Sequence, residues 1–232
     1  MTKHLLWEVE QLKRMILSLS ALVEENLRRA VKAVEDKDQA LAEKAIEIDK
    51  EIDRMEVKVE EECLKILALH QPVAFDLRFI VSVLKINREL ERIGDLATNI
   101  AERVSVLAVR KNISLTFDFP GMTEKTQNML RLSLDSLVKL DSSIARSVLP
   151  LDDEVDEIHR GMYDLVKKGI RNKQDIDVMI HLLMISRHLE RIADHAVNIA
   201  KDVIYLVEAE IVRHKGSIWK SSNSSSSEPA NT

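Results

Sequence analysis

The stretch "LERIGDLATNIAERV" at residues 90–104 returns in closely similar form as "LERIADHAVNIAKDV" at residues 189–203. In both copies apolar residues recur every three or four positions, which is the period of one face of an α-helix. Extended to either side, residues 76–104 match residues 175–203 at about half of their positions. A repeat of this kind predicts that the chain consists of two homologous halves.

The composition favours helices throughout the chain. The 232 residues are 45% hydrophobic but only 3% aromatic, with five glycines and four prolines, so helix formers dominate and helix breakers are scarce. Helical spacing continues almost everywhere, and strand-like alternation is essentially absent. The few polar or proline-containing breaks predict six helices, over residues 3–35, 39–69, 73–110, 122–148, 151–170 and 175–214.

Together, the repeat and the breaks predict an all-α fold of two tandem homologous three-helix bundles. The irregular segment at residues 111–121 is the expected boundary. We therefore assign residues 1–112 to the first half and residues 113–215 to the second half. Residues 216–232 form a Ser-rich tail with almost nothing to pack, and we expect them to be disordered.

Charge and composition exclude several classes of protein. A net charge of −5 with few aromatic residues argues against nucleic-acid binding. A single cysteine allows neither a disulfide framework nor a cysteine-based zinc site. No apolar run approaches the roughly 18 residues of a membrane span, and acidic residues stand where a signal peptide would have its apolar core. We expect a soluble cytoplasmic protein and leave peripheral membrane association open.

The repeated motif carries a pair of acids four residues apart. Residues at this spacing share one face of a helix, and the same spacing recurs on the second helix of each half. Each half is therefore expected to gather four carboxylates from two neighbouring helices. The predicted metal ligands are Asp49, Asp53, Glu91 and Asp95 in the first half and Asp152, Asp156, Glu190 and Asp194 in the second.

Clustered carboxylates repel one another, and a bound cation removes that cost. Carboxylates with an amide oxygen nearby suit oxygen-seeking ions. Asn99 and Asn198, one turn beyond the acid pairs, are possible supporting residues. His195 is either an added ligand or, as we expect, a surface residue. The acids could instead form a solvated face, or pair with the neighbouring arginines.

No arrangement typical of catalysis accompanies these acids. A Glu-x-x-His metal motif, a nucleophile triad and a glycine-rich phosphate loop are all absent from the sequence. A regulator or binding module is therefore favoured over an enzyme. A metal-dependent hydrolase and a purely structural helical scaffold remain the alternatives.

Three features of the chain resemble the PhoU family of phosphate-signalling proteins. They are "HQPVAFDLRFIVSVLKINRELERIGDLATNIAERV" at 70–104, "HLERIADHAVNIAKDVIYLV" at 188–207, and the paired acids on the second and fifth helices. The resemblance implies two three-helix bundles with multinuclear metal clusters on the acids named above. Iron, Mn, Mg, Ni and Zn are the candidate ions.

The resemblance also implies a function. It implies a negative regulator of phosphate uptake and phosphate-starvation signalling, acting in the cytoplasm as a homodimer or higher oligomer. Its implied partners are the ATPase subunit of the phosphate ABC transporter and a phosphate-sensing histidine kinase, with membrane contact only through them. Ala193 stands in place of Gly94, and Lys201 in place of Glu102. The second metal site is therefore expected to differ in charge or occupancy.

Overall fold

The computed structural model describes residues 3–109, 119–172 and 175–212, and within them every regular element is a helix. The helices are α1 (Lys3–Asp36), α2 (Gln39–His70), α3 (Ala74–Glu102), α4 (Val104–Ala108), α5 (Phe119–Lys139), α6 (Ser142–Val148), the 3-10 turn η1 (Leu149–Leu151), α7 (Asp152–Arg171) and α8 (Ile176–Glu208). The predicted Ser-rich tail and most of the predicted connection at 111–121 lie outside the described residues.

Capping residues set several of the helix ends. The Asp38 carboxylate accepts the Leu41 N–H at 3.0 Å and so begins α2. Gln71 adopts a left-handed φ of 46° that ends α2, and Pro72 follows it. Asp175 begins α8 in the same way as Asp38 begins α2. Polar capping residues and a proline thus mark helix ends that the sequence analysis also recognises.

Two of the six predicted helices are divided. Leu140 has a positive φ of 51°, and Asp141 then caps α6 through the Ser143 N–H at 2.8 Å, so the predicted helix 122–148 becomes α5 and α6. The predicted helix 73–110 becomes α3 and α4, joined at Arg103. The prediction that Pro120 belongs to the irregular connection is wrong: it lies in the first turn of α5, where its missing N–H costs little.

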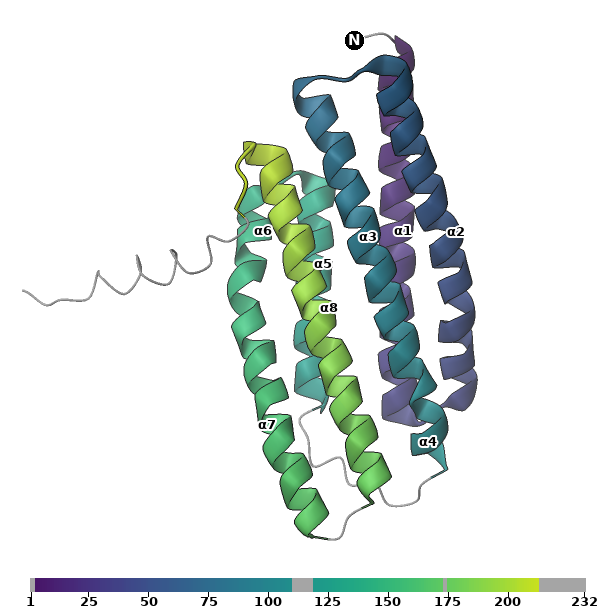
Figure 1. Cartoon of the computed structure of the whole chain (residues 1–232), viewed down its shortest axis with the longest axis vertical. Helices are drawn as coiled ribbons and strands as arrows, with labels where there is room; N and C mark the ends of the chain where they lie inside the picture. Colours follow the sequence, from purple (N-terminus) through teal and green to yellow (C-terminus); the bar gives the residue numbers. More distant parts are fainter. Residues whose placement is uncertain (1–2, 110–118, 173–174, 213–232) are drawn as a thin grey trace, which may run out of the picture.

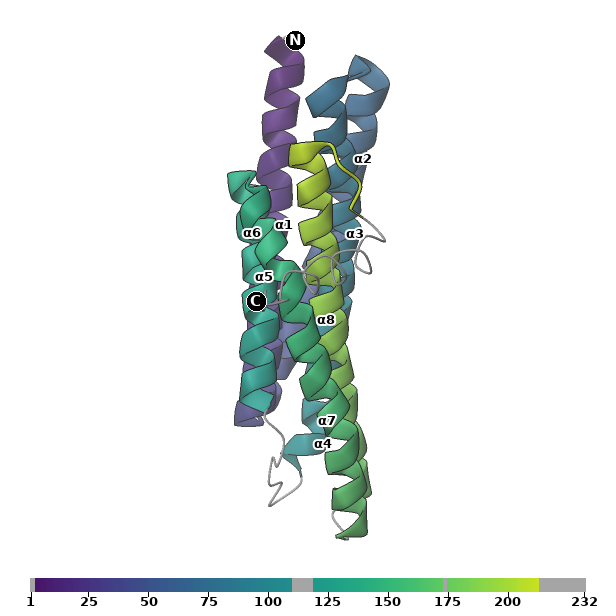
Figure 2. The same ribbon diagram turned by 90° about the vertical axis from the view of Figure 1, so that its left-hand side faces the viewer.

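The helices pack as two groups that lie side by side (Figure 1). Helices α1, α2 and α3 contact one another, while α8 contacts α5, α6 and α7. The two groups meet mainly between α3 and α8, and a second view shows that they are displaced along the long axis (Figure 2). No helix within the described ranges is long and apolar enough to cross a membrane.

The repeated motif supplies the apolar centre of both groups. Its leucines and isoleucines are fully buried, and α1 and α2 contribute further isoleucines from the other helices of the first group. These central side chains include Ile16, Ile52, Leu90, Ile93, Ile100, Leu189, Ile192 and Ile199. Burial at these positions therefore explains why the two copies of the motif share Leu90 with Leu189, Ile93 with Ile192 and Ile100 with Ile199.

A row of polar contacts crosses the seam between α3 and α8. Arg78 Nε donates to the Leu206 carbonyl at 3.4 Å, Ser82 Oγ donates to the Asp202 carbonyl at 3.5 Å, and Lys85 Nζ lies 3.4 Å from Asp202 Oδ1. The residue numbers of the partners on α8 decrease as the residue numbers along α3 increase, so the two helices run antiparallel. This row fixes the register between the two halves.

Gly94 allows α2 and α3 to approach each other closely. A Cβ atom at this position would lie 3.1 Å from Ile52 Cδ1 and 3.2 Å from Asp49 Oδ1. Both separations are shorter than ordinary van der Waals contact. A large side chain at Gly94 would therefore force the two helices apart.

Substitution of Gly94 by leucine should lower stability by about 1–3 kcal/mol, because the added side chain overpacks this contact. The matched control is Gly161→Ala on α7, where a new Cβ has no neighbour within 4 Å. That variant should gain up to about 1 kcal/mol from helix propensity. Thermal unfolding of both variants checks the prediction, and a Gly94→Leu melting temperature at or above that of the natural protein would contradict it.

Candidate metal centre

The four predicted acids of the first half come from the facing helices α2 and α3. Asp49 Oδ1 is buried and lies against Gly94, and interaction with Thr98 opposes part of the pKa rise that burial causes. Burial, together with the charges of Asp53 and Asp95, raises the pKa of Asp49 to about 6. The carboxylates of α2 and α3 therefore lie close enough for Asp53 and Asp95 to disfavour the ionisation of Asp49.

The pKa of Glu91 reflects the same crowding of carboxylates, and it adds Glu56, which was not predicted, to the first cluster. Burial raises the pKa of Glu91, and Asp95, Glu56 and Asp53 raise it further. Glu56 lies three residues beyond Asp53 on α2, so its spacing along the same helix face was the available signal. The first cluster thus contains five interacting carboxylates rather than four.

The acids of the second half repeat the arrangement on α7 and α8. Burial, Asp194 and Asp156 raise the pKa of Asp152 to about 6. Burial and Asp156 likewise raise the pKa of Asp194. Lys201 acts in the opposite direction on both acids, because its positive charge favours their ionised forms. The expected charge difference between the halves is therefore present, and Lys201 produces it.

Neither acid cluster is closed around a single point. Within the described ranges, His4, Glu8 and His70 form the only group of three His, Cys, Asp or Glu residues whose ligand atoms all lie within 4.8 Å of one another. The eight predicted acids would have to rotate their side chains to share an ion. Their role as metal ligands stays a prediction.

The possible supporting residues differ in what they contact. Asn99 Nδ2 donates to the Asp95 carbonyl at 2.8 Å, which keeps this amide beside the first cluster. His195 is not the surface residue that we expected, because it is only 8% exposed. Its Nδ1 lies 2.6 Å from Glu89 Oε2, and Asn198 Nδ2 donates to the same oxygen at 3.2 Å.

Glu89 therefore extends the polar row between α3 and α8. Burial alone would raise its pKa, but the hydrogen bonds from His195 and Asn198 hold the pKa of Glu89 below its ordinary value. Glu89 was not among the predicted site residues, although it continues the three- and four-residue spacing of Arg78, Ser82 and Lys85. In this structure His195 and Asn198 connect the two halves.

Comparison with known proteins gives the same picture for both halves and the whole fold. The PhoU domain matches residues 16–104 and, separately, residues 119–203. The crystal structure of PhoU from Pseudomonas aeruginosa superimposes with a TM-score of 0.83 at 36% identity, covering 88% of this chain and 98% of that one. The phosphate transport system regulatory protein PhoU from Streptococcus pneumoniae gives a TM-score of 0.82 at 29% identity, covering 90% and 99%.

Sequence relatives are similar over comparable lengths. Phosphate-specific transport system accessory protein PhoU homologs from Pseudomonas putida and Aquifex aeolicus are 37% and 38% identical, with 90% of this chain covered in each case and 82% and 95% of those proteins. The accessory protein PhoU of Escherichia coli strain K12 is 30% identical over 90% of this chain and 87% of its own length. With both halves matched and the fold shared, the chain belongs to the PhoU family.

Proposed function

We propose that this protein is a negative regulator of phosphate uptake and of phosphate-starvation signalling. The observation that carries the proposal is the extent of the similarity to proteins named as accessories of the phosphate-specific transport system. The alignment with the Aquifex aeolicus protein runs through 90% of this chain and 95% of that protein. This chain therefore has a counterpart for nearly the whole length of that accessory protein.

In this proposal the protein is a cytoplasmic adaptor between the ATPase subunit of the phosphate ABC transporter and a phosphate-sensing histidine kinase, and it works as a homodimer. Exposed apolar side chains support a role in protein contact. Around the connection between α2 and α3, Leu69 is 64% exposed, Val73 73% and Phe75 43%. Large apolar side chains grouped in solvent are typical of surfaces that bind other proteins.

Metal ions on the two acid clusters are the second part of the proposal. The donor set fits an oxygen-seeking ion, with iron, Mn and Mg as the first candidates and Ni or Zn as others. The position of Asp49 supports this fit, because its Oδ1 is buried beside the charges of Asp53 and Asp95, and such a carboxylate is costly unless positive charge compensates it. A bound ion would supply positive charge that joins α2 to α3 and α7 to α8.

The two clusters would then respond differently to metal. Lys201 already places a positive charge beside Asp152 and Asp194, so the second cluster has less repulsion for an ion to relieve. The first cluster has five carboxylates, whose burial and mutual charges raise the pKa values of Asp49, Glu56 and Glu91. Metal binding would therefore relieve more carboxylate repulsion in the first half than in the second. This gives a physical route from metal binding to a change in partner binding.

Asp95→Asn should reduce the bound metal more strongly than Asp194→Asn does, because the first cluster has the greater need for positive charge. Metal content by mass spectrometry after equilibration with each ion provides the measurement. Asp164→Asn, an exposed acid on α7 beside Lys167, is the matched control and should leave the metal content unchanged. Unchanged metal content in both cluster variants would refute the metal part of the proposal.

Stability of the metal-free protein should depend on Asp49 in a defined pH range. The pKa of this acid is about 6 in the folded protein against an ordinary 3.8, so its stabilising contribution is complete below pH 3.8 and is lost as the pH rises through 6. Asp49→Asn removes this loss. Calorimetry in a chelator should show the variant melting about 2–4 °C higher at pH 8 and no higher at pH 4. A difference that does not change with pH would contradict this assignment.

Deletion of the gene tests the regulatory proposal directly. Cells grown in rich phosphate should then express phosphate-starvation genes, and the natural gene supplied in trans should silence them again. Transcript levels and phosphate uptake are the two measurements. Unchanged expression in the deleted strain would sink the proposed function, whatever the outcome of the metal experiments.

A further inference from the structure

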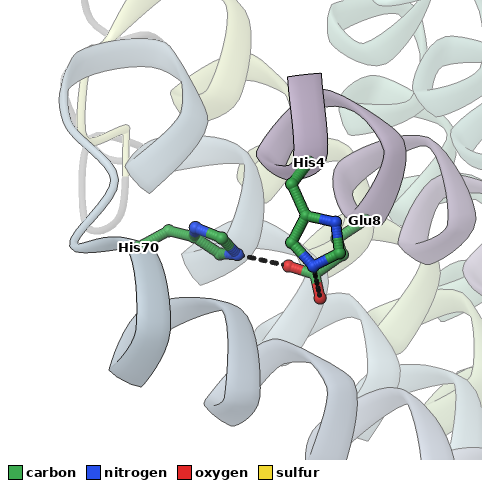
Figure 3. Close-up of side chains that lie close together, drawn as sticks. All are labelled: His4, Glu8 and His70. Atoms are coloured by element: carbon green, nitrogen blue, oxygen red, sulfur yellow. Dashed lines mark hydrogen bonds and ion pairs between the residues drawn. The ribbon is translucent and has the colours of Figure 1, made fainter. Parts of the chain in front are cut away.

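Two histidines and a glutamate meet where the start of α1 passes the end of α2 (Figure 3). His4 and Glu8 are one turn apart on α1, and His70 is the last residue of α2. The Nε2 atoms of both rings face the carboxylate: His70 Nε2 lies 2.5 Å from Glu8 Oε2, and His4 Nε2 lies 3.5 Å from Glu8 Oε1. One ligand atom from each residue therefore points into the same small region.

The surrounding structure holds these side chains in place. Glu8 is only 1% exposed, so its carboxylate is fixed at the packed face of α1. The left-handed Gln71 ends α2 directly after His70, and its N–H returns to the Leu67 carbonyl at 3.3 Å. The His4 ring stacks on Trp7 with a centroid separation of 6.3 Å and an interplanar angle of 10°. The group is thus assembled from two helix ends rather than from a mobile loop.

The donor set differs from that of the acid clusters. Zinc binds imidazole nitrogen and carboxylate oxygen at about 2.0–2.2 Å, which places tetrahedral ligand atoms about 3.3 Å apart. The three ligand atoms of this group already lie within 4.8 Å of one another. Small side-chain rotations would equalise their separations. Two imidazoles favour zinc, nickel, cobalt or copper over the harder ions Mg and Ca.

We propose that His4, Glu8 and His70 form a site for a divalent first-row transition ion, with zinc as the expected occupant and water in the fourth position. The ion would join the first turn of α1 to the last turn of α2. This site lies outside both acid clusters, and it does not depend on the proposed function in phosphate regulation.

Lys65 would compete with the metal ion for the Glu8 carboxylate. Its Nζ lies 3.1 Å from Glu8 Oε1 and 3.0 Å from Glu62 Oε1, so it supplies positive charge to the buried carboxylate. The Lys65 side chain is 45% exposed and can swing away at little cost while keeping its contact with Glu62. Metal binding would therefore exchange one cation for another at Glu8.

A simpler interpretation is that the imidazoles only satisfy the buried carboxylate. His70 and Lys65 are sufficient for that purpose, because they contact the two separate oxygens of Glu8 at 2.5 Å and 3.1 Å. His4 is 69% exposed at its side chain and lies 3.5 Å from an oxygen that Lys65 already holds. The His4 Nε2 atom nevertheless faces the shared region, and a bound metal ion would account for that orientation.

The experiment uses the full-length chain, with excess Mg²⁺ present to saturate hard-ion sites. Zinc binding is measured by calorimetry. Copper binding is followed by the fluorescence of Trp7, whose ring stacks on that of His4. The chain has two tryptophans, so Trp219→Phe is introduced to leave Trp7 as the reporter. We expect one zinc equivalent that Mg²⁺ does not displace, and quenching of Trp7 by one equivalent of copper.

Ligand and competitor variants should change the affinity in opposite directions. His4→Gln and His70→Gln should each weaken zinc binding about tenfold or more, since each removes one of three protein ligands. Lys65→Gln should tighten zinc binding, because the ion no longer displaces an ammonium from Glu8. His181→Gln on α8 is the matched histidine control and should bind zinc with unchanged affinity.

His4→Gln is the decisive variant, because an exposed side chain in the first turn of α1 can change without unfolding the protein. Circular dichroism confirms the fold of each variant before titration. Zinc affinity that survives both His4→Gln and His70→Gln would overturn the proposal. Copper titration that leaves Trp7 fluorescence unchanged would overturn it as well.

Discussion

The contact between α3 and α8 is the constraint on which the rest of the structure depends. Each of these helices must pack against its own group and also against the other group, so apolar residues occupy more than one face of each helix. Leu90 and Ile93 on α3 and Leu189 and Ile192 on α8 are fully buried for this reason. The acids of the two clusters lie instead where α2 faces α3 and where α7 faces α8, and partial burial there brings them together.

The same constraint decides what the sequence could predict. Periodicity, the repeat and polar or proline-containing breaks are local signals, and they predicted six helical segments, two of which the structure divides, together with most helix ends. The left-handed turn at Leu140 carries no glycine or asparagine to announce it. The contact of Glu89 with His195 joins residues 106 positions apart. It could not be predicted until the docking of α3 on α8 was known.

The acid clusters could be predicted only in part from the sequence. Helical spacing predicted which carboxylates share a face, and the structure places them where burial and mutual repulsion raise the pKa values of Asp49 and Asp152 to about 6. Spacing could not reveal how much water each acid would lose, nor that Glu56 joins the first group. Comparison of the two repeats did identify Lys201 in place of Glu102, and the positive charge of Lys201 favours the ionised forms of both Asp152 and Asp194. The halves are similar in shape and different in charge.

The polar row across the seam gives that difference a further consequence. The position equivalent to Asp202 in the first half is Arg103. Arg103 acts across to α8, because burial together with the charge of Arg103 lowers the pKa of His188 to about 4. If two copies of the first half associated through α3 in the same register, Lys85 would face Arg103 instead of Asp202. Like charges would then meet at both ends of the seam. The seam is therefore selective for one half of each kind, which favours pairing within a chain over pairing between identical halves of two chains.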